Sequence, residues 1–130
     1  MKIFIAYKFT GETRESLENT VGDLTRFLKE KGHDVYCTLL DKNIQAQTKN
    51  VLFDFALKEI DKSEVLMIFL QSKDKSEGML MEVGYAMAKN KRIVLLVSKE
   101  VKKTHLMDLV KEKYKFNDMN DLYTKLEAFK

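Results

Sequence analysis

Short runs of apolar residues alternate along the chain with segments in which apolar residues recur every three or four positions. The continuous runs predict buried β-strands and the spaced segments predict amphipathic helices. The apolar runs predict five strands, at about 3–6, 35–38, 64–70, 93–97 and 114–116. Helices are expected over about 13–31, 49–62, 76–90, 104–111 and 119–129, and residues 39–48 are expected to form the longest polar loop.

Regular alternation of strand and helix favours a parallel sheet with helices on both faces. The 130 residues suit one domain, spanning 1–130, with the small doubly wound (flavodoxin-like, Rossmann-like) five-stranded parallel sheet in the order 2-1-3-4-5. In that order the switch point lies between the first and third strands. The loops that follow these two strands, 7–12 and 71–76, are therefore expected to meet at one crevice.

The first of these loops, Lys8-Phe9-Thr10-Gly11, combines a glycine and a hydroxyl with the start of a helix. Free amides at a helix N-terminus suit a phosphate group. A plain strand-to-helix turn, in which Gly11 adopts a positive φ and Thr13 caps the helix, explains the same residues. The spacing of the threonines also resembles the flavodoxin phosphate loop, so a flavin-binding electron carrier stays open, although the chain has no tryptophan.

The second loop leads into a helix that contains Ser76, Gly78 and Glu82. Ser76 is a good N-cap, whereas glycine in the first turn does not favour a helix and would let a ligand approach the backbone. Glu82 lies beside an apolar stripe that includes Met79. It points either at the crevice or at solvent, and an ordinary exposed glutamate remains an alternative.

Composition narrows the function classes. The net charge of +3 comes from lysines interleaved with acids, which does not indicate binding to a nucleic-acid polymer. No apolar run approaches the roughly 18 residues of a membrane span, and the short N-terminal run does not resemble a signal peptide, so a cytoplasmic location is expected. The single cysteine, Cys37, excludes an internal disulfide. His33 and His105 lack neighbouring ligands, and neither a metal site nor a cofactor is expected.

The segment 76–86, Ser-Glu-Gly-Met-Leu-Met-Glu-Val-Gly-Tyr-Ala, resembles the nucleoside 2-deoxyribosyltransferase family. The resemblance extends over about residues 50–97, with a looser likeness in the first strand and loop. It implies the doubly wound fold, with Glu82 as the nucleophile that attacks the anomeric carbon of a 2-deoxyribosyl group. It also implies a phosphate site formed by Ser76, Gly78 and Met79 together with the loop 8–11.

Two positions depart from the family pattern. The tyrosine that the family has within its first strand corresponds to Phe4, so Tyr7 at the end of that strand is the candidate replacement. The family's aspartate on the helix before the third strand corresponds to Ala56, which leaves Asp54, two residues away, as the candidate.

The resemblance therefore implies an enzyme that cleaves the N-glycosidic bond of a 2-deoxynucleoside 5-monophosphate or a nucleoside. It also implies a homodimer or a larger homo-oligomer. Two alternatives stay open: a nucleotide-binding sensor without turnover, motivated by Phe4 and Ala56, and an NAD-cleaving domain of the Toll/interleukin-receptor type, whose first strand is similar to residues 3–7.

Overall fold

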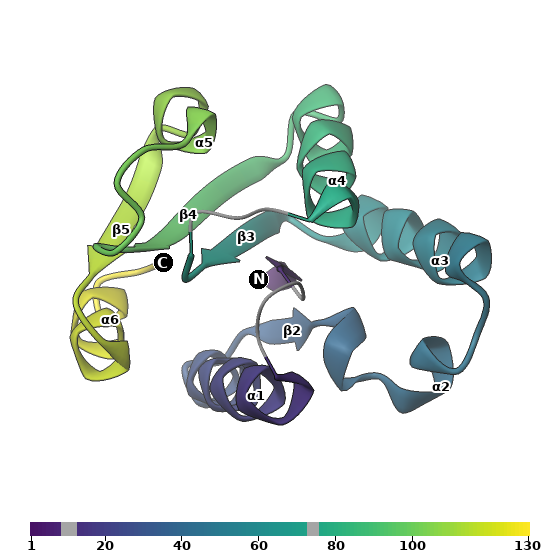
Figure 1. Ribbon diagram of the computed structural model, residues 1–130, viewed down its shortest axis with the longest axis horizontal. Coiled ribbons are helices and arrows are strands. Elements are labelled where there is room, and N and C mark those ends of the chain that lie inside the picture. Colours follow the sequence, from purple (N-terminus) through teal and green to yellow (C-terminus); the bar gives the residue numbers. More distant parts are fainter. Residues whose placement is uncertain (9–12, 73–75) are drawn as a thin grey trace.

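The protein is described by a computed structural model that covers residues 1–8, 13–72 and 76–130. Its strands are β1 (Lys2–Tyr7), β2 (Asp34–Tyr36), β3 (Val65–Leu70), β4 (Arg92–Ser98) and β5 (Glu112–Phe116). They form one sheet in the order β2-β1-β3-β4-β5, and each neighbouring pair is parallel (Figure 1). The predicted doubly wound fold and strand order are therefore confirmed.

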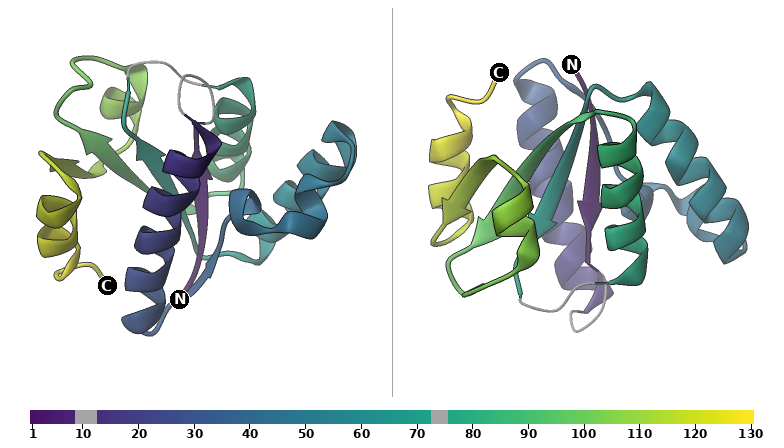
Figure 2. Two further views of the ribbon diagram at one scale, coloured as in Figure 1. Left: turned by 60° about the horizontal axis from the view of Figure 1, so that its bottom comes forward. Right: turned by 90° about the horizontal axis from the view of Figure 1, so that it is seen from above.

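Helices cover both faces of this sheet. They are α1 (Arg14–Glu30), the 3-10 turn η1 (Thr38–Leu40), α2 (Lys42–Gln45), α3 (Lys49–Lys62), α4 (Glu77–Ala88), α5 (His105–Leu109) and α6 (Met119–Leu126). Helices α1 and α6 pack on one face, and α3, α4 and α5 on the other. Seen from the α4 side, the strands run between α4 in front and α1 behind (Figure 2, right). No helix in the described ranges combines the length and the apolar character needed to cross a bilayer.

The two faces are separated by the alternation of side chains along β1. Ile3 and Ile5 belong to the core under α1 and α6, whereas Phe4 and Ala6 belong to the core under α3 and α4. All residues of β3 are buried, as its continuous apolar run predicts for a central parallel strand.

The segment expected to be a polar loop at 39–48 contains two helical turns instead. The second strand ends at Tyr36, two residues earlier than predicted, and Thr38 begins η1. Asp41 then caps α2, accepting a hydrogen bond from the backbone N–H of Ile44 at 3.2 Å. The Ile44 side chain is buried. Capping and one buried apolar side chain hold this short helix, and neither produces a periodic pattern that could be recognised in the sequence.

Helix α4, which carries the candidate glutamate, is fixed against α3 at its C-terminal end. The Tyr85 hydroxyl donates to Asp61 Oδ1 at 2.8 Å. Lys91 Nζ donates to the backbone carbonyl of Asp61 at 2.9 Å. These contacts, together with the buried Val83 and Ala86, set the position of α4, so that its N-terminal half lies at the carboxyl ends of the strands.

Candidate active site

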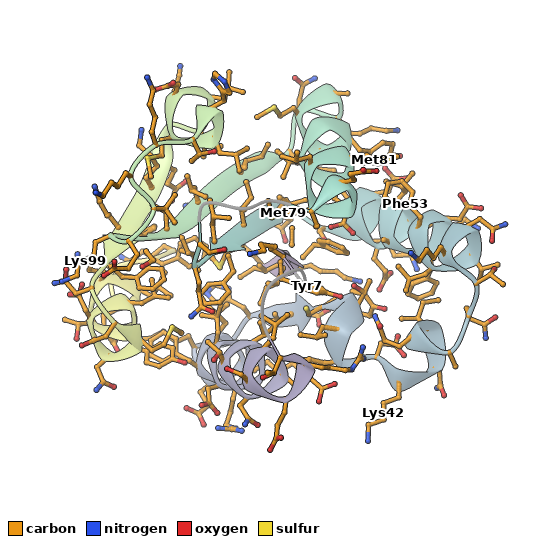
Figure 3. The ribbon with its side chains drawn as sticks, viewed as in Figure 1. Tyr7, Lys42, Phe53, Met79, Met81 and Lys99 are labelled. Atoms are coloured by element: carbon orange, nitrogen blue, oxygen red, sulfur yellow. The ribbon has the colours of Figure 1, made fainter. Side chains whose placement is uncertain are left out.

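A small pocket lies at the switch point between β1 and β3, where the topology predicts a ligand site. Its volume is about 140 Å³, and it is lined by Tyr7 of β1, Thr38 of η1, Leu52 and Phe53 of α3, and Ser76, Gly78, Met79 and Glu82 of α4 and its cap. Figure 3 shows Tyr7, Phe53 and Met79 approaching this region from three different elements. The structure thus brings together five of the predicted residues: Tyr7, Ser76, Gly78, Met79 and Glu82.

Glu82 is a buried carboxyl group without a counter-charge. Its exposed fraction is 8%. Among the residues that the structure describes, none forms a hydrogen bond or an ion pair with it. Burial raises the pKa of Glu82 to about 8, because desolvation disfavours the ionised form. The carboxyl is therefore mostly protonated near neutral pH, and a carboxyl group can act as a nucleophile only after it has lost that proton.

Tyr7 ends β1 beside Glu82. Its hydroxyl lies 3.4 Å from Thr38 Oγ1. Burial raises the pKa of Tyr7 to about 12, and the nearby Glu82 carboxylate acts in the same direction. The phenol therefore stays protonated at physiological pH, and it can both accept and donate hydrogen bonds next to the carboxyl group.

The N-terminus of α4 forms another wall. Ser76 is the N-cap, and its Oγ accepts a hydrogen bond from the backbone N–H of Met79 at 3.2 Å. A Cβ added at Gly78 would meet no atom within 4 Å. No neighbour in the described part of the chain therefore requires glycine at this position. An open first turn with unpaired amides is suited to an anionic group.

Lys8 follows Tyr7 and is buried, with Nζ donating to Ser72 Oγ at 2.5 Å. This bond joins the ends of β1 and β3, but Lys8 is not one of the residues that line the pocket. The predicted phosphate contacts Phe9, Thr10 and Gly11 lie outside the described residues. Within the described ranges, no group of three or more His, Cys, Asp or Glu side chains could hold a metal ion.

Asp54, predicted to replace the family's aspartate, is not brought to the pocket. Its side chain is exposed on α3, while Phe53, the preceding residue, lines the cavity. Consecutive residues on a helix point about 100° apart. Because Phe53 lines the pocket, the side chain of Asp54 points away from it. At the two departures from the family pattern, Phe4 and Ala56 are fully buried. The prediction of a catalytic Asp54 gains no support from this geometry.

Thr38, Leu52 and Phe53 line the pocket and were not predicted as site residues. The two apolar residues belong to the helical apolar spacing of the 49–62 segment, which does not distinguish a pocket residue from a core residue. Only the strand order indicates that these two residues, near the start of α3, lie beside the switch-point pocket. Thr38 could not be found, because it was assigned to a strand that ends earlier.

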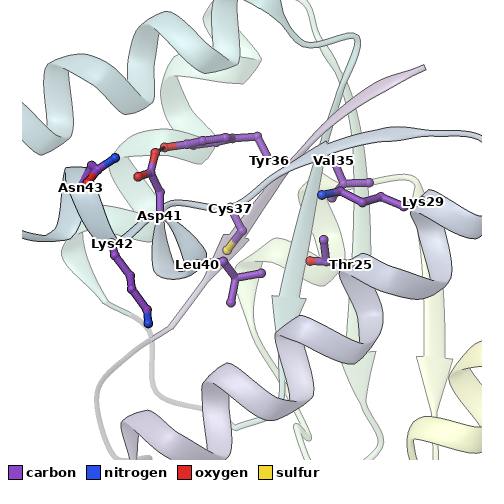
Figure 4. Close-up of a pocket in the computed structure, with 9 residues that line it drawn as sticks. All are labelled: Thr25, Lys29, Val35, Tyr36, Cys37, Leu40, Asp41, Lys42 and Asn43. Atoms are coloured by element: carbon purple, nitrogen blue, oxygen red, sulfur yellow. Dashed lines mark hydrogen bonds between the residues drawn. The ribbon is translucent and has the colours of Figure 1, made fainter.

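A larger cavity of about 420 Å³ lies between α1 and the edge strand β2 (Figure 4). Its acidic side chain, Asp41, already accepts a hydrogen bond from the Tyr36 hydroxyl at 2.8 Å. Burial raises the pKa of its thiol, Cys37, to about 12, so this thiol is a poor nucleophile. The smaller pocket is therefore the better candidate for chemistry.

The family model described as nucleoside 2-deoxyribosyltransferase matches residues 7–119. The chain belongs to this family. The match includes every residue that lines the pocket. Membership in the nucleoside 2-deoxyribosyltransferase family confirms the resemblance seen in the sequence and indicates an enzyme of glycosyl transfer or N-glycosidic cleavage in general.

Solved structures share the fold of this family member. CMP N-glycosidase BcmB of Clostridium botulinum has 21% identity and a TM-score of 0.75, with 100% of both chains covered. A 2-deoxyribosyltransferase of Bacillus psychrosaccharolyticus has 18% identity and a TM-score of 0.72, covering 100% of this chain and 93% of its own. A conserved protein of Enterococcus faecalis V583 has 16% identity and a TM-score of 0.59, covering 97% of this chain and 87% of its own. No curated protein matches in sequence.

Proposed function

We propose that the protein cleaves the N-glycosidic bond of a 2-deoxynucleoside 5-monophosphate, or of the matching nucleoside, with Glu82 as the nucleophile. The observation that supports this most is the position of Glu82. It is a buried carboxyl group at the switch-point pocket, and no cation neutralises it among the described residues. A carboxyl group isolated in this way is costly for folding, which favours a chemical role over a structural one.

The reaction takes two displacements. The Glu82 carboxylate attacks the anomeric carbon, a bond forms between them, and the C–N bond breaks with its electron pair leaving on the base, which takes up a proton. Water, which gives up a proton to solvent, or a second base then attacks the same carbon, and the bond to Glu82 breaks with its electron pair returning to the carboxylate. Both steps pass through an oxocarbenium-like state, which the negative charge of Glu82 stabilises. The apolar walls formed by Leu52, Phe53 and Met79 limit the access of competing water.

The preference for a monophosphate rests on the start of α4. Ser76 Oγ accepts from a backbone amide, which leaves its own O–H available as a donor. The open surface above Gly78 and the positive end of the α4 dipole suit a phosphate placed there. Lys8, and the residues 9–11 that lie outside the described ranges, stay candidates for further contacts with the same phosphate.

The test is base release by the purified full chain, followed by chromatography. The substrates are the common 2-deoxynucleoside 5-monophosphates, the deoxynucleosides, CMP and NAD. CMP is included because one similar structure is a CMP N-glycosidase. We expect release from at least one deoxynucleoside monophosphate and none with Glu82→Gln. No release from any substrate at high enzyme concentration would refute catalysis, and cleavage of NAD alone would favour the Toll/interleukin-receptor type.

The phosphate site has its own test. Ser76→Ala should raise KM for the monophosphate about tenfold, the loss of one hydrogen bond to a charged group, and leave KM for the nucleoside unchanged. Thr104→Ala is the matched control, because Thr104 is also an N-cap, at α5, away from the pocket. Equal effects of Ser76→Ala on nucleotide and nucleoside would contradict a phosphate contact.

A nucleotide sensor without turnover is the second candidate. It is favoured by Phe4 and Ala56, because neither side chain can supply the hydroxyl or carboxylate that the family pattern places there, and both are fully buried. Calorimetry distinguishes the two functions: heat of binding from a nucleotide that is recovered intact would support the sensor.

We also infer that the protein self-associates through the outward face of α4. Leu80 and Met81 are large apolar residues with exposed fractions of 42% and 57%, and Gly84 is exposed beside them. Two α4 helices related by a two-fold axis perpendicular to them would run antiparallel and place Glu77 of one copy near Lys89 of the other. Light scattering should show a dimer that Met81→Asp dissociates; a monomeric wild type at high concentration would contradict this.

A further inference from the structure

The hydroxyls of Tyr7 and Thr38 form a pair beside Glu82. They come from different elements, the end of β1 and the start of η1, and their oxygens are 3.4 Å apart. Both residues line the pocket that Glu82 shares. The pair has two hydroxyl protons and one mutual hydrogen bond, so one proton is left over to donate to another group in the pocket.

The position of Thr38 is fixed by contacts of its backbone and of the helical turns that follow it. Its side chain is buried, and its backbone carbonyl accepts a hydrogen bond from Gln45 Nε2 at 2.8 Å. The helical turns that follow are fixed by Asp41, which accepts from the Tyr36 hydroxyl at 2.8 Å. The Thr38 hydroxyl therefore has a defined position, although it lies in a segment without a regular strand or long helix.

The described residues that line the pocket with Glu82 are neutral. Burial holds the Tyr7 phenol and the Cys37 thiol in their protonated forms, since it raises both pKa values to about 12. From α3 the pocket receives only Leu52 and Phe53. Among the described charged groups nearest in sequence to the lining residues, Asp54 is exposed, Glu77 is exposed on the first turn of α4, and Lys8 donates to Ser72. Among the described lining residues, the side-chain hydroxyls of Tyr7, Thr38 and Ser76 are the groups that can donate a hydrogen bond to a negative charge on Glu82.

We propose that Thr38 is a positioning residue, whose hydroxyl donates to the Tyr7 oxygen and so orients the Tyr7 O–H towards the Glu82 carboxylate, to which it donates. This inference rests on the proposed function of Glu82 as a nucleophile. It gives the pocket a means of stabilising the charged form of Glu82 without a cation, which would compete with the sugar for the carboxylate. It also explains why a threonine hydroxyl is buried at the start of η1.

The experiment compares Thr38→Val, which removes the hydroxyl and keeps the shape, with Thr38→Ser, which keeps the hydroxyl. Thr25→Val is the matched control, because Thr25 is another buried threonine, and its hydroxyl has no partner among the described residues. For Thr38→Val, kcat should fall about three- to tenfold with little change in KM. The pH at which activity rises should move upward by about half to one unit. Thr38→Ser should restore both values, and Thr25→Val should change neither.

A double-mutant cycle with Tyr7→Phe tests whether Thr38 acts on Glu82 through the Tyr7 hydroxyl. If Thr38 acts through Tyr7, Thr38→Val has no further effect once the Tyr7 hydroxyl is absent. An equal effect of Thr38→Val in both backgrounds, or an effect no larger than that of Thr25→Val, would overturn the proposal. Circular dichroism of each variant verifies that it is folded.

Carbon-13 NMR titration of the Glu82 carboxyl gives a readout that needs no turnover. The titration midpoint of Glu82 should rise in Thr38→Val and in Tyr7→Phe, and stay unchanged in Thr25→Val. If the wild type releases no base but these midpoints move as expected, the proposed reaction fails and the role of Thr38 stands. If base is released but the midpoints do not move, the role of Thr38 fails alone.

Discussion

Two glutamates of this protein are almost equally buried, with exposed fractions of 7% for Glu59 and 8% for Glu82. Glu59, near the C-terminal end of α3, lies 3.6 Å from Lys2 Nζ and 3.4 Å from Lys62 Nζ. Glu82, at the carboxyl ends of the strands, has no cationic partner among the described residues, and its pKa is raised to about 8. The two acids are therefore alike in burial and differ in their counter-charge, and the chemical role proposed for Glu82 depends on that difference.

The largest contrast is expected in activity. Glu82→Gln should lower kcat for base release by about a thousandfold or more, because the amide cannot form the glycosyl bond. Glu59→Gln, the matched substitution at the other buried glutamate, should leave kcat within about threefold of the wild type. Rates are compared at saturating substrate in variants verified to be folded. A similar loss in both variants would mean that Glu82 acts through stability and not as the nucleophile.

The next contrast is in the pH dependence of stability. Glu82 has a pKa of about 8 in the folded protein against an ordinary value of 4.5, so the folded state holds a proton that the unfolded state has lost between those pH values. The stability contributed by the neutral carboxyl is present in full below about pH 4.5 and is lost as the pH rises towards 8. The slope is up to about −1.4 kcal/mol per pH unit.

Urea unfolding at several pH values measures this slope. Glu82→Gln should reduce it across the window from pH 5 to 8 and should make the protein more stable than the wild type at pH 8. Glu59→Gln should leave the slope in place. A wild type whose free energy of unfolding does not fall faster than that of Glu82→Gln in this window would contradict the raised pKa.

A smaller effect is expected when Glu59 loses a partner. Lys2→Met should lower the free energy of unfolding by about 1 kcal/mol, because a partly buried pair is broken. Lys62→Met is the control. Its side chain is 66% exposed against 25% for Lys2, so its loss should change stability by only a few tenths of a kcal/mol. Neither variant should alter base release. A change in kcat would show that the ion pairs of Glu59 influence the pocket at Glu82.

The smallest effect is expected at Asp54. This acid is exposed and does not line the pocket, so Asp54→Asn should leave kcat and KM within about twofold of the wild type. A drop of more than about tenfold, measured on the same substrate, would show that Asp54 reaches the site during turnover.

The fold could be predicted because its strands differ so clearly in pattern from its helices. The buried run of β3 and the helical spacing in α1 determine the layers, and parallel alternation then leaves few arrangements. The convergence of Tyr7, Ser76 and Glu82 followed from that topology, because the carboxyl ends of β1 and β3 meet at the switch point.

The remaining parts of the site depend on contacts that have no local pattern. Thr38 is positioned because Gln45 holds its carbonyl and because β2 ends at Tyr36. Whether Phe53 or Asp54 faces Glu82 depends on the rotation of α3 about its axis. That rotation is set by the burial of Ala56 and Ile60 against the sheet, and a shift of one residue would have exchanged the two side chains.

The segment from Glu82 to Ala86 is short, but its residues make different contacts. Val83 and Ala86 are buried in the core, and Tyr85 ties α4 to Asp61. Nothing among the described residues explains the glycine at Gly84. A descendant gene that encoded glutamine at position 82 would keep the residues that hold the helix in place. Loss of the proposed catalysis in such a lineage would therefore leave the fold intact. Most of the segment from Glu82 to Ala86 would be unchanged, and only the codon for position 82 would show the loss.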